Sequence, residues 1–210
     1  MISLHLEALT GPGKALFPKL AAFKDEFYLA GGTAFALSLG HRVSVDFDLF
    51  SSNPIKKTLL IQVENELADG PVTPMVTTSR ELTVMVKGVK CTFLHYPFEV
   101  LLPFVVDTPL NILSTSEILA TKAYTIGRRG SLKDYVDLWI GIKAGVATLP
   151  EIIALADRKY ADAFNDRLFL EQLLYLDDVA DENLLMHGHT QPNKSELQTF
   201  FSEHIEHLPI

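Results

Sequence analysis

The chain has 210 residues, of which 48% are hydrophobic, and its formal net charge is −8 at pH 7. This length fits one large domain or two small ones, and the apolar content is ample for a packed core. The negative charge argues against a protein that coats nucleic acid non-specifically, although a local basic groove stays compatible with an RNA substrate. The single cysteine, Cys91, excludes an internal disulfide.

No segment of the sequence predicts targeting to or insertion into a membrane. Residues 1–10 lack the basic stretch and long apolar core of a signal peptide. The most apolar stretch, residues 98–106, is interrupted by Glu99 and Pro103 and is too short to span a bilayer. We therefore expect a cytoplasmic protein without a membrane partner.

The first fifty residues predict a helical lead-in over residues 1–27, followed by a strand, a turn and a helix. Tyr28-Leu29-Ala30 is apolar and tolerates β structure, and Gly31-Gly32 permits a tight turn because neither residue has a Cβ. The run Thr33–Leu39 has helical spacing, and Gly40 is placed to end that helix.

Two aspartates follow on the next predicted strand. Val45 to Phe50 alternates with a period of two, so Asp46 and Asp48 project from the same face. Two neighbouring carboxylates suit a hard divalent cation such as Mg²⁺, which carboxylates often hold together with substrate phosphates. The glycine turn ahead of a helix offers backbone N–H groups and a positive dipole end, which suit phosphate. Together these features predict a site for a metal–triphosphate complex.

The remaining elements predict three strands and then a helical region. After a helix over residues 54–68, the period changes to two, which predicts strands 75–78, 82–87 and 89–96 with a hairpin at Lys87-Gly88. A further strand is expected over residues 104–106. Two cap-like patterns, Ser114-x-x-Glu117 and Ser131-x-x-Asp134, precede the predicted helices 118–126, which would end at Gly127, and 132–143. Three more helices are expected at 150–160, 166–176 and 195–208.

The residues of the central segment resemble a known family. Gly31-Gly32-Thr33, followed by His41-Arg42-x-Ser44-x-Asp46-x-Asp48, is similar to the signature of AbiEii-type nucleotidyltransferases, which are minimal members of the polymerase-β-like superfamily. The resemblance implies an α+β fold in which a mixed sheet with flanking helices, residues 1–110, precedes a helical C-terminal region, residues 111–210. It also extends to a later set of residues, which comprises Lys122, Arg128-Arg129, Lys133-Asp134 and Asp137.

The resemblance implies that a nucleotide moves from a nucleoside triphosphate to an acceptor, RNA or protein, in a toxin–antitoxin or phage-defence system with an antitoxin partner. Asp46 and Asp48 would hold Mg²⁺ or Mn²⁺, and Lys122 would neutralise phosphate charge. The expected nucleotide-binding set is Gly31, Gly32, Thr33, Arg42, Ser44 and Lys122. Asp134 and Asp137 form a second candidate set, for which helix-dipole stabilisation or ion pairs with Arg128 and Arg129 are the alternative.

The sequence departs from the superfamily at one position. A third carboxylate is expected on a later strand beside the aspartate pair, and the matching position, Thr92, carries no charge. Such a carboxylate completes metal binding or acts as a general base. The uncharged Thr92 leaves open a catalytically lapsed nucleotide-binding module. The acidic net charge leaves open a transferase that acts on a cationic small molecule instead of RNA or protein.

Overall fold

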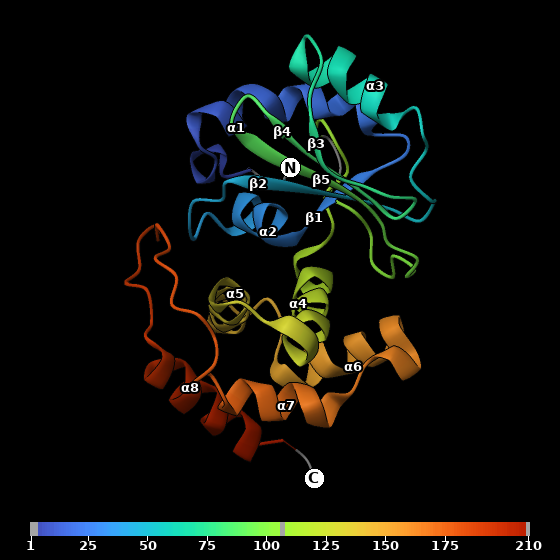
Figure 1. The fold of residues 1–210 in the computed structure, drawn as a ribbon. Helices are drawn as coiled ribbons and strands as arrows, with labels where there is room; N and C mark the ends of the chain where they lie inside the picture. Colours follow the sequence, from blue (N-terminus) through green and yellow to red (C-terminus); the bar gives the residue numbers. More distant parts are fainter. Residues whose placement is uncertain (1–3, 106–107, 209–210) are drawn as a thin grey trace. The chain divides into compact units, whose positions relative to one another are not determined.

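A computed structural model of the protein describes residues 4–105 and 108–208. The chain divides into two units, Met1–Ser114 and Thr115–Ile210, and each has its own buried core. The first unit contains the sheet, and the second is helical (Figure 1). The α+β class expected from the sequence is confirmed, with a mixed sheet, flanking helices and a helical C-terminal region.

Within the described residues, five strands of the first unit form one sheet with the order β1-β2-β5-β4-β3. The central strands β2 and β5 are parallel, and the other neighbours are antiparallel. β1 therefore runs against β2, so that Ala30 at its end lies beside Asp48. The strands are β1 (Tyr28–Ala30), β2 (Asp46–Ser51), β3 (Pro74–Thr77), β4 (Glu81–Val86) and β5 (Val89–His95).

The predicted hairpin between β4 and β5 is confirmed. Val86 pairs with Val89 across the turn, and both turn residues have positive φ, 50° at Lys87 and 82° at Gly88. This conformation matches the twist of two antiparallel strands, and glycine adopts it without a Cβ clash. The hairpin places β5 beside β4, and the other edge of β5 pairs with β2.

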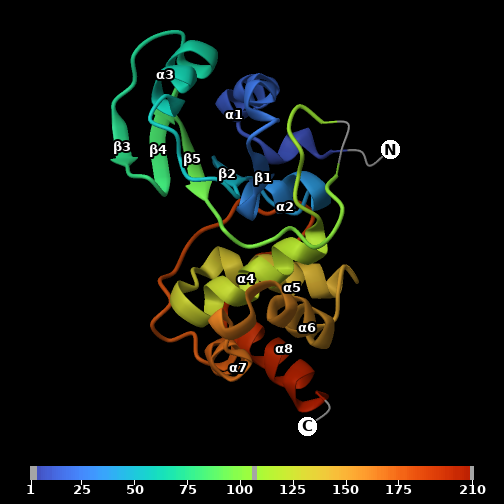
Figure 2. The same ribbon diagram turned by 90° about the vertical axis from the view of Figure 1, so that its right-hand side faces the viewer.

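Helical segments cover both faces of the sheet in the first unit. Figures 1 and 2 show α1 and α3 over one face and α2 over the other. On the first face, the ring of Phe17 stacks on Phe47 at 6.2 Å, and Phe23 and Phe27 pack against Phe93. The α-helices are α1 (Gly11–Leu16), α2 (Gly31–Leu39) and α3 (Leu59–Val63); 3₁₀ turns span Leu6–Ala8 and Phe17–Phe23, and a π-helical turn spans Glu64–Ala68.

Two expectations for the first unit need correction. The helix expected to begin at Pro54 begins only at Leu59. Ahead of it, the Ile55 amide donates to the Ser79 carbonyl at 2.9 Å, and residues 57–58 form a turn. In the strand expected over residues 104–106, Val105 forms only an isolated bridge with Ile112, and Val106 lies outside the described residues. Both segments follow tertiary hydrogen bonds that no local pattern specifies.

In the second unit, α4 packs against α5, α6 and α7 (Figure 2). Its buried residues include Ile118, Leu119, Ala123 and Ile126. The helices are α4 (Thr115–Arg129), α5 (Leu132–Lys143), α6 (Leu149–Tyr160), α7 (Asp166–Leu174) and α8 (Lys194–Glu206), and Ala161–Ala163 forms a 3₁₀ turn. The capping box predicted at Ser131 and Asp134 is confirmed at the start of α5.

The expected end of the first of these helices at Gly127 is wrong. Helix α4 continues through Gly127 to Arg129. A Cβ at Gly127 would lie 3.9 Å from the backbone of Phe169, an ordinary contact distance, so the fold leaves room for a larger residue here. A glycine costs a helix interior about 1 kcal/mol relative to alanine, and α4 tolerates that cost at this position. In residues 4–105 and 108–208, no helix is both long and apolar enough to cross a membrane.

Candidate functional site

The two aspartates of β2 lie on one face of the strand, as their spacing predicts. Between and after them, Phe47 and Leu49 point to the opposite face and are almost fully buried. These apolar side chains fix which way the strand faces, because a shift by one residue would bury both carboxylates and expose both apolar groups. Asp46 and Asp48 are only partly exposed, and the side chain of Asp46 keeps 12% of its surface accessible.

The start of α2 lies directly against Asp48. Gly31, the first residue of the helix, has φ +66°, a conformation that residues with a Cβ rarely adopt. A Cβ at Gly31 would also overlap Asp48 Oδ2 and lie 3.2 Å from Asp48 Cγ. Gly31 thus lets the helix N-terminus approach the carboxylate, and the first-turn amides of α2 have no carbonyl of their own helix to bond.

A buried hydroxyl pair ties α2 to the segment that leads into β2. The Oγ atoms of Thr33 and Ser44 are 2.6 Å apart, and Thr33 Oγ1 also donates to the Asp46 carbonyl. Both side chains are nearly inaccessible, at 0% and 5% exposure. In this structure the two hydroxyls hold the backbone of Asp46 in place, and their contact with a nucleotide stays a prediction.

Arg42, another predicted nucleotide-binding residue, is also buried. Its exposure is 3%, and its Nη1 donates to the Val43 carbonyl at 3.1 Å. Gly32 is the second residue of α2 and is partly exposed. Phosphate contacts of Arg42 and Gly32 stay predictions. A contact of the Gly32 amide requires no side-chain movement, whereas a contact of Arg42 requires its buried side chain to rearrange.

Strand β5 presents Lys90 and Thr92 opposite the aspartate pair. The register pairs Asp46 with Lys90 and Asp48 with Thr92. Lys90 Nζ lies 3.4 Å from Asp46 Oδ2. Among residues 4–105 and 108–208, no group of three or more His, Cys, Asp or Glu side chains is arranged to hold a metal ion. Lys90 is not among the residues predicted for the site, although its position two residues before Thr92 places it on the same strand face.

The thiol of Cys91 lies on the other face of β5. Its burial, together with the charges of Asp48 and Asp46, raises the pKa of Cys91 to about 12. A thiol with this pKa stays protonated at neutral pH, and the thiolate is the nucleophilic form. Cys91 is therefore a core residue and not a nucleophile of this site.

The second unit holds Lys122, Asp134 and Asp137 in a buried cluster. Lys122 Nζ lies 2.7 Å from Asp134 Oδ1 and 2.8 Å from Asp137 Oδ2, and the three side chains are at most 10% exposed. Burial alone would lower the pKa of Lys122, but Asp137 and Asp134 outweigh it and raise the pKa above its ordinary value. Burial likewise opposes ionisation of Asp134, yet Lys122 and the Ser131 amide bring its pKa below the ordinary range.

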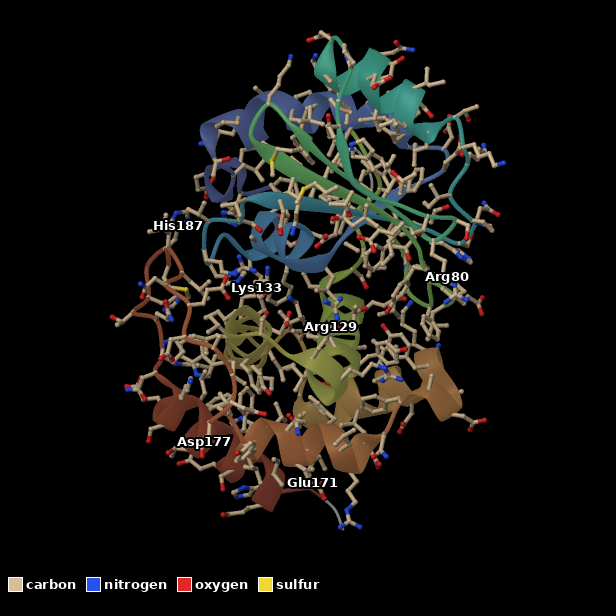
Figure 3. All side chains as sticks on the ribbon, viewed as in Figure 1. Arg80, Arg129, Lys133, Glu171, Asp177 and His187 are labelled. Atoms are coloured by element: carbon tan, nitrogen blue, oxygen red, sulfur yellow. The ribbon has the colours of Figure 1, made fainter. Side chains whose placement is uncertain are left out.

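The sequence offers Arg128 and Arg129 as alternative partners of these aspartates, but the structure shows different contacts for Arg128 and an exposed position for Arg129. Arg128 Nη2 donates to the Ala163 carbonyl at 2.6 Å, and its guanidinium lies 3.9 Å from the centre of the Tyr124 ring. Arg129 is exposed at the end of α4 (Figure 3). Lys122 therefore supplies the ammonium that both Asp134 and Asp137 contact.

A second buried ion pair in this unit joins α4 to α6. Lys159 Nζ lies 2.6 Å from Glu117 Oε1, and neither side chain has accessible surface. The sequence pattern predicts Glu117 in a helix cap and gives no signal at Lys159. No local signal reveals this pair, because the two residues lie on helices that meet only in the folded unit.

The chain is similar to several known proteins. A family model described as the AbiEii toxin nucleotidyl transferase of type IV toxin–antitoxin systems matches residues 14–209. The protein aq_aa25 of Aquifex aeolicus is 28% identical over 186 residues, which cover 87% of each chain.

Two solved structures share the fold. The nucleotidyltransferase toxin MenT4 of Mycobacterium tuberculosis aligns with a TM-score of 0.59 at 16% identity and covers 98% of this chain and 88% of its own. JHP933 of Helicobacter pylori aligns with a TM-score of 0.53 at 16% identity, over 93% of this chain and 89% of its own. At such identities these alignments support the fold alone. The family match spans nearly the whole sequence, including the aspartate pair and the Lys122 cluster, and the protein therefore belongs to the AbiEii nucleotidyl transferase toxin family.

Proposed function

We propose that the protein transfers a nucleotide from a nucleoside triphosphate to an acceptor and needs Mg²⁺ or Mn²⁺ to do so. The observation that carries the proposal is the placement of Asp46 and Asp48 on one face of β2, with the glycine start of α2 against Asp48. No single feature of this arrangement is specific to nucleotides. Together they combine oxygen ligands for a hard cation with backbone donors for phosphate.

The aspartate pair fits a divalent ion by its donor chemistry. Carboxylate oxygens are preferred ligands of Mg²⁺, which is commonly held by one or two carboxylates while phosphates and water complete its shell. The partly exposed Asp46 and Asp48 can offer these oxygens to a ligand that arrives from solvent. When bound, the ion would neutralise phosphate charge and stabilise the departing pyrophosphate.

The residues of the chain bind and orient the triphosphate in the proposed reaction. The first-turn amides of α2, at Gly31 and Gly32, donate to phosphate oxygens, and the Thr33–Ser44 hydroxyl pair keeps Asp46 in position. An acceptor hydroxyl oxygen then forms a bond to the α-phosphorus. The bond from that phosphorus to the oxygen bridging the β-phosphate breaks, its electron pair leaves with pyrophosphate, and the hydroxyl proton passes to solvent.

A contact of Lys122 with the triphosphate remains part of the proposal but carries a structural condition. The ammonium is held by Asp134 and Asp137 at 2.7 and 2.8 Å. It would have to exchange at least one of these partners for a phosphate oxygen. The acceptor is proposed to be RNA or protein, and membership of a toxin–antitoxin family supports an antitoxin as a further partner.

The test is calorimetric titration of each of the four ribonucleoside triphosphates, with and without Mg²⁺. We expect metal-dependent binding to the wild type that is lost in Asp46→Asn and Asp48→Asn. Asp69→Asn is the matched control, because it removes the same charge from an exposed position of the same unit. Binding that persists with an unchanged metal requirement in Asp48→Asn would show that this site is assigned wrongly.

A catalytically lapsed module is the second candidate, and the pairing of Asp48 with Thr92 favours it. It predicts the same metal-dependent binding without turnover. The two candidates are separated by measuring pyrophosphate release in the presence of total RNA and of a cell extract. Release that requires Asp48 supports transfer, whereas binding without release supports the lapsed module.

A further inference from the structure

The strand beside the aspartate pair has a cation, Lys90, two residues before Thr92, the position at which a third carboxylate is expected. Lys90 and Thr92 lie two residues apart on β5, so they share one face, and the register sets them opposite Asp46 and Asp48. The described residues place no third acidic side chain in a metal-binding group with this pair. The neighbouring charge supplied by β5 is therefore positive.

The geometry of Lys90 is that of an exchangeable partner. Its Nζ lies 3.4 Å from Asp46 Oδ2, and its side chain is 42% exposed whereas that of Asp46 is 12% exposed. An ammonium at this distance and exposure is held weakly, because solvent screens the attraction and the long side chain loses rotamer freedom. The stem of Lys90 can therefore swing away from Asp46 without disrupting the core.

The charges of the metal ion and of the triphosphate predict when Lys90 leaves Asp46. A divalent ion at Asp46 and an ammonium 3.4 Å from the same carboxylate repel each other. A triphosphate that enters with the ion brings more negative charge than one divalent ion neutralises. The phosphate oxygens then offer Lys90 a stronger, charge-assisted partner than the carboxylate it leaves.

We propose that Lys90 is a triphosphate-binding residue that occupies Asp46 before substrate arrives and passes to the phosphates when the metal–triphosphate complex binds. This inference rests on the proposed function and adds a residue to its site. It assigns to Lys90 two opposite effects. The residue competes with a metal ion that binds alone, and it assists a metal ion that binds together with triphosphate.

The test compares Lys90→Gln with the wild type in two titrations of the full chain. The first uses Mn²⁺ alone, followed by electron paramagnetic resonance, and the second uses inorganic triphosphate as its Mn²⁺ complex, followed by calorimetry. Without the competing ammonium, Lys90→Gln should bind Mn²⁺ about two- to fivefold more tightly, as expected for loss of a partly exposed ion pair. It should bind the triphosphate complex about tenfold more weakly. Lys90→Arg, which keeps the charge, should restore most triphosphate binding.

Lys87→Gln is the matched control. Lys87 lies at the β4–β5 turn, and its Nζ pairs with Asp69 at 2.6 Å. The substitution removes the same charge from the same hairpin, so both affinities should stay within about twofold of the wild type. Equal effects of the two substitutions would show that only the overall charge matters, and would overturn the inference.

The remaining outcomes distinguish this inference from the proposed function. If the wild type binds both probes, Asp46→Asn binds neither, and Lys90→Gln behaves as the wild type, the site stands and the role of Lys90 is wrong. If Lys90→Gln weakens both ligands alike, Lys90 supports the site without exchange, and the inference also fails. If the wild type binds neither probe, the proposed function fails and the inference with it.

Discussion

The two units use the same pair of residue types, lysine and aspartate, in opposite ways. In the second unit, Lys122 is held by two aspartates at 2.7 and 2.8 Å, and all three side chains are buried. In the first unit, Lys90 and Asp46 stand 3.4 Å apart with 42% and 12% of their side chains exposed. The buried cluster is nearly closed to water, whereas the strand pair can change partners.

This difference shows that burial, more than residue type, decides how much an ion pair matters for the stability of the fold. A buried ion pair compensates desolvation only while both partners are present, and removal of one partner leaves an expensive buried charge. A partly exposed pair contributes little to stability, since water replaces a lost partner. The contrast can be tested by substitutions and by pH.

The largest effect is expected for Lys122→Met. The substitution removes the ammonium that Asp134 and Asp137 both contact, and loss of one partner from a buried pair costs about 3–5 kcal/mol. Urea unfolding should be followed by the fluorescence of Trp139, the single tryptophan, which lies in α5. The triple variant Lys122→Met, Asp134→Asn, Asp137→Asn should recover a large part of the loss. A cost below about 1 kcal/mol for Lys122→Met would contradict the assignment of these charges to stability.

The same cluster should make the second unit sensitive to acid. The folded-state pKa of Asp134 lies below its ordinary value of 3.8, so its contribution is fully present above pH 3.8 and is lost as the pH falls through the folded value. In Lys122→Met the buried carboxylate has lost its cation, and its pKa should rise instead. The stability difference between wild type and variant should therefore shrink as the pH is lowered from 7 to 2.5. A constant difference, measured by unfolding at each pH, would be evidence against this linkage.

A smaller change in stability, with a larger change in binding, is expected for Gly31→Ala. Forcing a residue with a Cβ into this left-handed conformation costs about 1–2 kcal/mol, and the new Cβ would displace the Asp48 carboxylate. Mn²⁺ binding should therefore fall much more than thermal stability. Gly11→Ala is the matched control, since a Cβ there meets nothing within 4 Å. Unchanged Mn²⁺ binding in Gly31→Ala would show that Asp48 is not a metal ligand.

The smallest effect is expected for Arg167→Ala. Arg167 Nε lies 2.9 Å from Glu171 Oε1 one turn further along α7, where Figure 3 shows Glu171, but the two side chains are 87% and 58% exposed. Exposed pairs of this spacing contribute about 0.3–0.5 kcal/mol. Urea unfolding should show no loss above about 0.5 kcal/mol. A loss comparable to that of Lys122→Met would mean that burial does not distinguish these pairs.

The sequence predicts the strand that carries the candidate site because that strand obeys a local rule. Phe47 and Leu49 must face the core, so alternation alone places Asp46 and Asp48 together. The β4–β5 hairpin follows equally from the turn chemistry of Lys87 and Gly88. Where one face is buried and the turn is short, the residues themselves determine the geometry.

Other features depend on contacts between distant residues and could not be predicted in this way. Gly127 is expected to end a helix, but α4, which packs against α6 and α7, continues through it to Arg129. The burial of Lys122 between Asp134 and Asp137 depends on how α4 and α5 pack. The opposition of Lys90 to Asp46 depends on the parallel pairing of β5 with β2, which no local pattern specifies.

That parallel pairing also governs when the aspartate pair acquires its surroundings during folding. β3 and β4 lie between β2 and β5 in the sequence but outside both in the sheet. Non-local pairing of this kind forms slowly, because a long loop must close before any strand contact is gained, whereas the β4–β5 hairpin can form at once. During synthesis, Asp46 and Asp48 therefore emerge well before Lys90 and Thr92. A chain still being translated cannot present the two strands in register until β5 has left the ribosome, so the assembled site arises only late in the synthesis of the first unit.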